Sequence, residues 1–336
     1  MRYSDGATTE FSAAAEDTIL DAALRAGVAV RYQCESGTCG TCVARLTEGA
    51  CDMQPDDAPA LLTSEIQAGF RQLCVTRPLS DTLCFDLAYP GAGKGAMEIE
   101  RFSARISDVA LLSASVVKLG LTIADPKPFA FQPGQYVRLR VPGTDSWRSY
   151  SIATAESDLP RIELLIRLLK DGVASRWLRN GCSSGALVEL EGPSGRFVLK
   201  QNKGLHVMVA GGTGLAPILS MIDTLDRCTG LRPPILLCFG CNSMRDLFYL
   251  DELDNRAFSY PNLEVRIAVA DGAPSSPMVR AGTAVSLLDD SDLKRSGAAF
   301  YLCGPPPMVA AADERLVGAG VSRTAIFTEQ FVPSEG

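Results

Sequence analysis

Four cysteines constrain the fold and chemistry of this chain more than any other feature of its sequence. They are separated by four, two and thirty-one residues, so three lie in one C-x4-C-x2-C run and the fourth lies far downstream. This is the ligand spacing of plant-type [2Fe–2S] clusters. Gly37 and Gly40 would let the backbone wrap closely around a cluster and direct amides at its sulfurs. The expected metal ligands are Cys34, Cys39, Cys42 and Cys74.

Other kinds of site use the same residue types. Buried or redox-active thiols, or a zinc ion held by four cysteines, remain alternatives, although structural zinc favours C-x2-C pairs. The chain has a single histidine, His206, so neither a Rieske pair nor a two-histidine, one-carboxylate iron site can form, and oxygen activation must belong to another protein. Six further cysteines have no partner at ligand spacing and are expected to be small buried hydrophobes: Cys51, Cys84, Cys182, Cys228, Cys238 and Cys241.

The length of 336 residues exceeds one ordinary domain, and we expect three. A helix that Thr18 can cap and Gly27 can end lies in the first of them. The most glycine-rich stretch, residues 88–95, has no apolar period and predicts a flexible linker. The expected division is a first domain at 1–88, a linker at 89–98, a second domain at 99–202 and a third at 203–336.

Two different strand patterns follow the linker. From residue 102 to 199, short alternating or β-branched runs are broken by Pro-Gly and Gly-Pro pairs, which predicts an antiparallel barrel. Its expected strands are 115–123, 136–141, 149–152, 162–166 and 187–190. After residue 205, apolar runs alternate with helical segments, as in a parallel sheet wound with helices. Its expected strands are 205–210, 235–240, 263–269, 299–303 and 324–327.

The run Arg148–Ser151 lies at the start of a barrel strand and suits a flavin. A flavin needs a cation for its pyrophosphate, an aromatic face for its ring system and a hydroxyl near N5. Arg148, Tyr150 and Ser151 can supply these in that order, although Arg148 and Tyr150 could also be ordinary barrel-surface residues. A helix start led by glycine and serine is a natural phosphate site. The residues expected to bind the flavin are Arg148, Ser149, Tyr150, Ser151, Gly172 and Ser175.

A glycine-rich turn after the first strand of the third domain suits a dinucleotide. Gly211, Gly212, Thr213 and Gly214 allow a tight turn that brings a pyrophosphate to the helix start, and Pro217 replaces the last glycine of the usual fingerprint. Asp246, after the second strand, can accept from a ribose hydroxyl and would repel a 2′-phosphate, whereas the adjacent Arg245 could clamp that phosphate. Cys303 ends another strand and either touches the nicotinamide or is a core thiol. Gly304 and Pro305 follow it as further binding residues.

The charge and the apolar pattern narrow the possible partners. The net charge of −7 argues against nucleic acid and anionic membranes, which require a basic face. The start of the chain lacks a signal-peptide pattern, and no run of eighteen apolar residues exists. We therefore expect a cytoplasmic protein. We also expect it to be a monomer.

With these motifs together, the chain resembles the reductase components of ring-hydroxylating dioxygenases, most closely those of the benzoate, toluate and anthranilate type. The resemblance is carried by the residue runs 34–42, 52–57 and 327–331, and by the Pro217 variant of the glycine turn. It implies a multidomain fold: an α+β ferredoxin domain of the β-grasp type, an antiparallel β-barrel FAD domain and an α/β parallel-sheet nucleotide-binding domain. It also implies that Glu329 lies near the hydride-transfer site and Phe331 near the flavin ring.

The function expected from this resemblance is an NADH-dependent reductase with FAD and a [2Fe–2S] cluster as cofactors. NADH would give hydride to the flavin, positioned by Ser151, Cys303 and Glu329, and the cluster would pass single electrons to a terminal Rieske-type oxygenase that acts on an aromatic substrate. One alternative is the reductase of a di-iron hydroxylase of the phenol or methane monooxygenase type. Another is a redox sensor that uses flavin and cluster as a switch.

Overall fold

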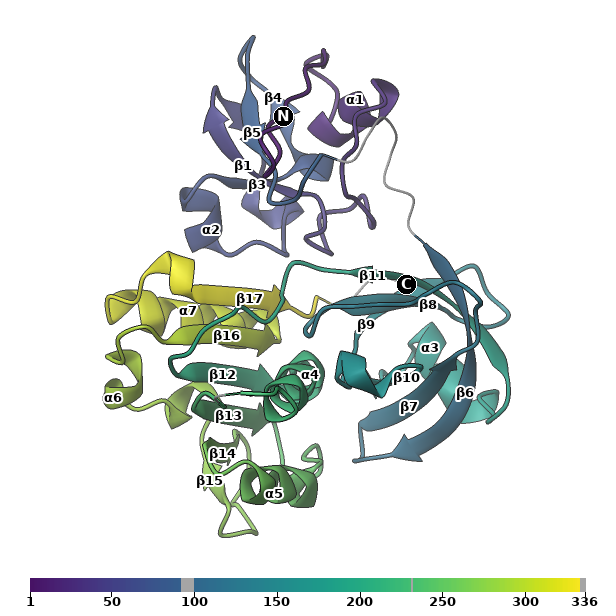
Figure 1. Ribbon diagram of the computed structural model, residues 1–336, viewed down its shortest axis with the longest axis vertical. Helices are drawn as coiled ribbons and strands as arrows, with labels where there is room; N and C mark the ends of the chain where they lie inside the picture. Colours follow the sequence, from purple (N-terminus) through teal and green to yellow (C-terminus); the bar gives the residue numbers. More distant parts are fainter. Residues whose placement is uncertain (92–99, 231, 333–336) are drawn as a thin grey trace. The chain divides into compact units, whose positions relative to one another are not determined.

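The computed structural model describes residues 1–91, 100–230 and 232–332 of the chain (Figure 1). Its contacts divide it into two compact units, residues 1–99 and 100–336. From residue 92 onward, the expected linker lies outside the described residues. The expected boundary at 202/203 falls inside the second unit, where Phe197 of the barrel and Met208 of the parallel sheet belong to one buried apolar cluster.

The first unit is built on a three-stranded antiparallel sheet with the order β3-β1-β5. Thr18 caps α1 by accepting from the Asp21 amide, and the helix is followed by Gly27 at φ +69°, as the sequence predicts. Helix α1 buries Ile19 and Leu20 in the unit's core. The elements are α1 (Ile19–Arg25), β1 (Val43–Glu48), β2 (Cys51–Asp52), α2 (Thr63–Gln67), β3 (Phe70–Gln72), β4 (Arg77–Pro78) and β5 (Cys84–Asp86), with 3-10 turns at Pro55–Asp57 and Leu73–Val75.

The core of this unit extends past the expected domain end at residue 88. Tyr89 is buried, and its ring lies edge-on to that of Tyr3 with 6.3 Å between centroids. Its hydroxyl accepts a 3.0 Å hydrogen bond from the Arg31 amide, and the Arg31 guanidinium lies 4.5 Å from the ring centroid. The expected linker start at residue 89 is therefore too early, because an aromatic ring in that glycine-rich stretch is needed to complete the core.

A six-stranded antiparallel sheet with the order β10-β7-β6-β11-β8-β9 forms the barrel of the second unit. A bridge between Ile152 and Leu164 joins the two ends of this order and closes it. Strand β6 was not expected from the sequence, although its buried Phe102, Ala104 and Ile106 alternate with exposed residues in the period of a half-buried strand. The elements are β6 (Arg101–Leu111), β7 (Val116–Ile123), β8 (Tyr136–Arg140), β9 (Trp147–Ser151), β10 (Arg161–Arg167), α3 (Val173–Asn180) and β11 (Leu187–Ser194), with a 3-10 turn at Glu156–Asp158.

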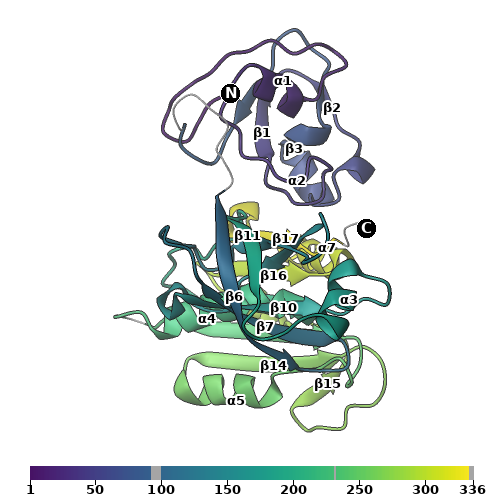
Figure 2. The same ribbon diagram turned by 90° about the vertical axis from the view of Figure 1, so that its right-hand side faces the viewer.

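The rest of the second unit is a six-stranded parallel sheet with the order β15-β14-β13-β12-β16-β17. Figure 2 shows α5 lying along β14. The chain order reverses between β12 and β16, and ligands of open α/β sheets bind at the carboxyl ends of the strands at such a point. The short β15 was not expected from the sequence. The elements are β12 (His206–Gly211), α4 (Leu215–Asp226), β13 (Ile235–Cys241), α5 (Leu250–Ser259), β14 (Leu263–Val269), β15 (Val279–Ala281), α6 (Asp290–Leu293), β16 (Ala299–Gly304), α7 (Pro306–Gly318) and β17 (Ile326–Gln330), with 3-10 turns at Gly212–Gly214, Val285–Leu287 and Arg323–Ala325.

Within the described ranges, no helix is both long enough and apolar enough to cross a membrane.

Candidate functional site

The four predicted metal ligands come together in the first unit. The Cys39 amide donates to Cys34 Sγ at 3.3 Å, and Cys42 Sγ lies 3.3 Å from Cys74 Sγ. The hydrogen bonds of the Cys39 and Cys74 thiols lower the pKa of Cys34, so one thiolate is stabilised by its neighbours. Among the described residues, no three His, Cys, Asp or Glu side chains are arranged to hold a single metal ion. Four grouped thiols are the number of ligands that a binuclear cluster takes, two for each iron.

Gly37 is required by the shape of the ligand loop. Its φ is +75°, and a Cβ at this position would lie 1.9 Å from the carbonyl oxygen of Asp57. The 3-10 turn Pro55–Asp57 therefore lies directly against the loop that carries the first three ligands. Gly40 also has a positive φ, of +69°, but the nearest atom to an added Cβ would be 3.8 Å away. Gly37 is therefore the position in this loop at which no side chain fits, while the predicted wrapping of the loop around a cluster stays a prediction.

The predicted flavin residues lie on β9 and at the start of α3. Ser151 is buried, Ser149 is exposed, and Arg148 and Tyr150 are half-buried. Burial raises the pKa of Tyr150 to about 12, so its hydroxyl stays neutral at physiological pH. Ser149 and Ser151 are expected on the same face of β9, because alternate residues of one strand share a face. Only Ser151 is buried, and its hydroxyl contacts Glu329 of β17.

The α3 start is held by Ser175, whose buried hydroxyl accepts a 2.8 Å hydrogen bond from the Leu169 amide. Gly172 is the N-cap of this helix, and a Cβ there would lie 3.2 Å from Ser175 Oγ. Ser175 therefore fixes the loop before the helix. Its predicted contact with a phosphate stays a prediction.

Ser151, Cys303 and Glu329, the three predicted catalytic residues, lie together. Ser151 Oγ donates to Glu329 Oε2 at 3.4 Å, which joins the barrel to β17. Cys303 and Glu329 are register partners on the neighbouring parallel strands β16 and β17. Burial raises the pKa of Glu329 to about 8, and burial together with the Glu329 charge raises the pKa of the Cys303 thiol. The fully buried Cys303 is thus both a core thiol and a neighbour of the predicted acid. Nearby, the Phe331 amide donates to the Gly304 carbonyl at 2.8 Å.

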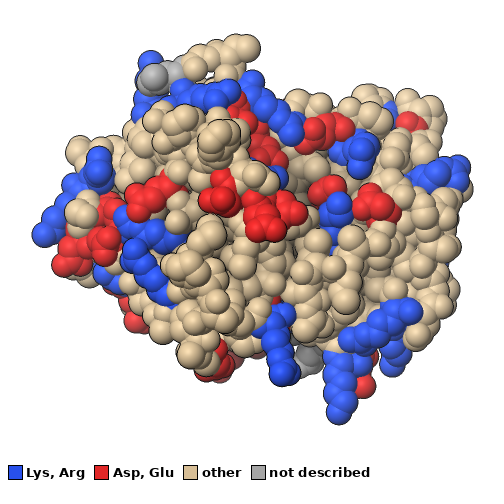
Figure 3. Space-filling view, turned by 90° about the horizontal axis from the view of Figure 1, so that it is seen from below, with Lys and Arg blue, Asp and Glu red and all other residues tan. Residues whose placement is uncertain are grey.

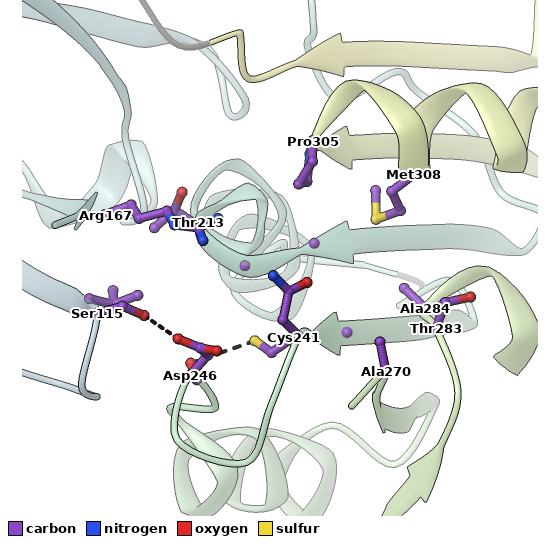
Figure 4. Close-up of a pocket in the computed structure, with 15 residues that line it drawn as sticks. Ser115, Arg167, Thr213, Cys241, Asp246, Ala270, Thr283, Ala284, Pro305 and Met308 are labelled. Atoms are coloured by element: carbon purple, nitrogen blue, oxygen red, sulfur yellow. Dashed lines mark hydrogen bonds between the residues drawn. The ribbon is translucent and has the colours of Figure 1, made fainter. Parts of the chain in front are cut away.

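A cavity of about 130 Å³ opens at the carboxyl ends of β12 and β13. Figure 4 shows that both the barrel and the parallel sheet contribute to its wall. Of the predicted dinucleotide residues, those that line it are Gly211, Gly212, Thr213, Asp246 and Pro305. Three barrel residues also lie in this wall and were not expected there: Ser115, Val116 and Arg167. None of the three belongs to a motif that would have indicated a role.

The remaining predicted dinucleotide-binding residues do not line the cavity. A Cβ on Gly214 would lie 2.3 Å from the Cys303 carbonyl oxygen, and Gly304, at φ +149°, packs against the Gly211 backbone. Pro217 is buried in the first turn of α4 and does not line the cavity. These glycines permit a close approach of two backbones, which shapes the turn without touching the cavity itself.

Three family models match the chain in succession. Residues 3–79 match the 2Fe-2S iron-sulfur cluster binding domain, residues 103–199 the oxidoreductase FAD-binding domain and residues 208–314 the oxidoreductase NAD-binding domain. The toluate 1,2-dioxygenase electron transfer component of Pseudomonas putida is 32% identical over 334 residues, which are 99% of this chain and 97% of that protein. The chain belongs to this family of electron transfer components.

Members of the family bear the names of different oxygenases. The propane 2-monooxygenase reductase component of Rhodococcus jostii is 30% identical over 96% of this chain and 88% of its own length. The crystal structure of an Amycolatopsis cytochrome P450 reductase is 30% identical, covers 96% of both chains and has a TM-score of 0.70. This electron transfer component is therefore an oxidoreductase with FAD, NAD and [2Fe–2S] domains, and the expected fold class is confirmed.

Proposed function

We propose that this protein carries electrons from NADH, through FAD and the [2Fe–2S] cluster, to the Rieske-type terminal oxygenase of an aromatic-ring dioxygenase system acting on a benzoate-like substrate. The observation that carries the first half of this proposal is the cluster of Ser151, Cys303 and Glu329 beside the dinucleotide cavity. The four grouped thiols of the first unit support the second half.

FAD, when bound, supplies the conversion of a two-electron hydride donor into single electrons. The protein's own groups prepare the place where this occurs. Ser151 directs a hydroxyl from the barrel, and Glu329 holds a carboxyl whose pKa burial raises to about 8. Cys303 contributes a fully buried thiol beside Glu329. We assign Arg148 to the flavin pyrophosphate, Tyr150 and Phe331 to its ring, and Ser149, Gly172 and Ser175 to the surrounding cradle.

Asp246 is the basis for the proposed preference for NADH. It lines the cavity after the second strand, where an acid accepts from a ribose hydroxyl and repels a 2′-phosphate. Arg245, the residue that could reverse this choice, is exposed and forms no ion pair among the described side chains. We expect kcat/KM for NADH to exceed that for NADPH in steady-state assays with ferricyanide. Equal or higher values with NADPH would overturn the assignment.

The oxygenase partner can be identified by reconstitution. Purified terminal components of three kinds would be compared: a Rieske dioxygenase acting on benzoate, a di-iron hydroxylase of the phenol or methane monooxygenase type, and a cytochrome P450. We expect substrate-coupled NADH oxidation and product formation only with the Rieske component. Efficient coupling to the di-iron hydroxylase instead would favour that alternative.

A redox sensor would behave differently from a reductase. It would not oxidise NADH rapidly in the presence of a one-electron protein acceptor, whereas the proposed enzyme turns over continuously. We also propose that the protein acts as a monomer, which sedimentation equilibrium would test.

A further inference from the structure

A hairpin tip of the barrel reaches the loop that carries Asp246. The tip lies between β6 and β7, and it meets the loop between β13 and α5 through two hydrogen bonds. The Ala114 amide donates to the Arg245 carbonyl at 3.1 Å, and the Ser115 hydroxyl donates to Asp246 Oδ1 at 2.6 Å. Figure 4 shows Ser115 and Asp246 facing each other on one side of the cavity.

The carboxylate of Asp246 is held on both of its oxygens. Ser115 binds Oδ1 from the barrel, and Ser243 Oγ donates to Oδ2 at 2.8 Å from the same loop as the acid. The hydrogen bond from Ser115 is also the largest cause of the lowered pKa of Asp246, so this contact favours the ionised form. A carboxylate has about four acceptor positions, so after these two bonds Asp246 can still accept from a ribose hydroxyl.

The orientation of the Asp246 carboxylate decides whether it faces the cavity or the basic Arg167. Asp246 is the only acidic residue, and Arg167 the only basic one, among the described residues of the cavity wall. A carboxylate that turned toward Arg167 would be neutralised by it and would repel a 2′-phosphate less. Ser115 itself is fixed in place, because its carbonyl accepts a 2.8 Å hydrogen bond from the Leu168 amide, next to Arg167.

We infer that Ser115 is a positioning residue for dinucleotide specificity: its hydroxyl, donated from the barrel, holds Asp246 so that the carboxylate receives the 2′-hydroxyl of NADH and rejects the 2′-phosphate of NADPH. The inference rests on the proposed use of NADH. It adds that the choice between the two dinucleotides is made jointly by the barrel and the parallel sheet.

The test compares variants of the full-length, FAD-loaded protein. Ser115→Ala removes the hydroxyl, Ser115→Thr keeps it, and Ser184→Ala serves as the matched control because Ser184 Oγ makes a 2.8 Å hydrogen bond to the Ser107 carbonyl elsewhere on the barrel. Steady-state kinetics with both dinucleotides and ferricyanide would give KM and kcat separately. Calorimetric titration with NAD⁺ and NADP⁺ would give affinities that do not depend on turnover.

We expect Ser115→Ala to lower the ratio of kcat/KM for NADH to that for NADPH by about tenfold, mainly through KM, as befits one lost hydrogen bond to a charged group. Ser115→Thr should restore most of the ratio, and Ser184→Ala should leave it unchanged. In the double variant with Asp246→Asn, removal of Ser115 should have little further effect, because it acts through that carboxylate.

An unchanged ratio of kcat/KM for NADH to that for NADPH in Ser115→Ala would overturn the inference. Equal losses of kcat/KM with both dinucleotides would also overturn it, because they would show that Ser115 only stabilises the fold. If Asp246→Asn alone still abolishes the preference in that case, the proposed NADH function stands. A wild-type protein that prefers NADPH would instead refute the proposed function itself.

Discussion

Ser151 and Glu329 are 178 positions apart in the chain, yet the serine hydroxyl donates a hydrogen bond of 3.4 Å to the glutamate carboxylate. The bond joins the last barrel-strand residue of β9 to β17 at the edge of the parallel sheet. The environment of Glu329 is therefore created by two parts of the second unit at once, and its protonation should report on whether they are correctly assembled.

Substitution of Glu329 should change how stability depends on pH. Burial raises the pKa of this carboxyl from 4.5 to about 8 in the folded protein, so the stabilising contribution is complete below about 4.5 and is lost as the pH rises through 8. We expect the free energy of unfolding of the flavin-free protein to fall by about 1.4 kcal/mol between pH 7 and pH 9 on this account. Urea unfolding of wild type and Glu329→Gln at both pH values would measure it. Equal losses in the two proteins would contradict the prediction.

His206 should make the protein sensitive to mild acid. Its ring is fully buried and stacks on Tyr301 with 5.8 Å between centroids, and burial lowers its pKa from 6.5. The unfolded chain therefore binds a proton first, so stability is lost as the pH falls below about 6.5, at up to about 1.4 kcal/mol per pH unit.

Because His206 is the chain's only histidine, a histidine contribution to the loss of stability below about pH 6.5 can be assigned to this residue. Urea unfolding between pH 7 and pH 5.5 should show a slope in wild type that is reduced in His206→Phe. A variant as acid-sensitive as wild type would show that carboxylates are responsible instead.

Removal of one cluster ligand should separate the two electron-transfer steps. Cys74→Ser replaces a soft thiolate by a harder oxygen, so we expect loss of most of the two irons per chain. NADH-dependent reduction of ferricyanide, which can take electrons at the flavin, should be kept, while reduction of cytochrome c should fall sharply. Iron analysis and the two assays would show this. Full cytochrome c reduction by iron-depleted protein would mean that electrons do not leave through the cluster.

The steric role of Gly37 can be isolated from its backbone conformation. Gly37 and Gly27 have nearly the same positive φ, +75° and +69°, but an added Cβ meets the Asp57 carbonyl at 1.9 Å in the first case and nothing within 4 Å in the second. Gly27→Ala should cost about 1–2 kcal/mol of stability and leave the iron content unchanged. Gly37→Ala should also lose iron. Comparable iron content in both variants would show that the ligand loop can shift away from Asp57.

The first unit should govern how salt affects the delivery of electrons. Residues 1–91 contain thirteen acidic and six basic residues, which account for the whole net charge of −7, and the rest of the chain is balanced. On the face shown in Figure 3, acidic and basic side chains both occur. We expect the rate of cytochrome c reduction, a cationic acceptor, to fall several-fold from about 50 to about 300 mM salt. A rate independent of salt would exclude electrostatic docking on this unit.

Local spacing was sufficient to predict the cluster and most strands. The expected ligands Cys34, Cys39 and Cys42 lie in one loop, so their spacing alone predicts a cluster site. The apolar run 263–269 coincides with the observed β14. Ser115 and Arg167 were missed because their place in the cavity wall comes from where the barrel folds against the sheet. No local pattern contains that information. Pro217 is the converse case: its place in a motif predicted a binding residue, whereas in the fold it is buried in α4 and does not line the cavity.

The bridge between Ile152 and Leu164 has a consequence for the solubility of the protein. Strand β9 is the last in the barrel order, and without this closure its outer backbone groups would form an open edge. Such an edge is a template for pairing with another chain, and it would expose the segment that holds Arg148, Tyr150 and Ser151. A protein in which the bridge is broken would therefore be prone to self-association before the flavin is ever bound.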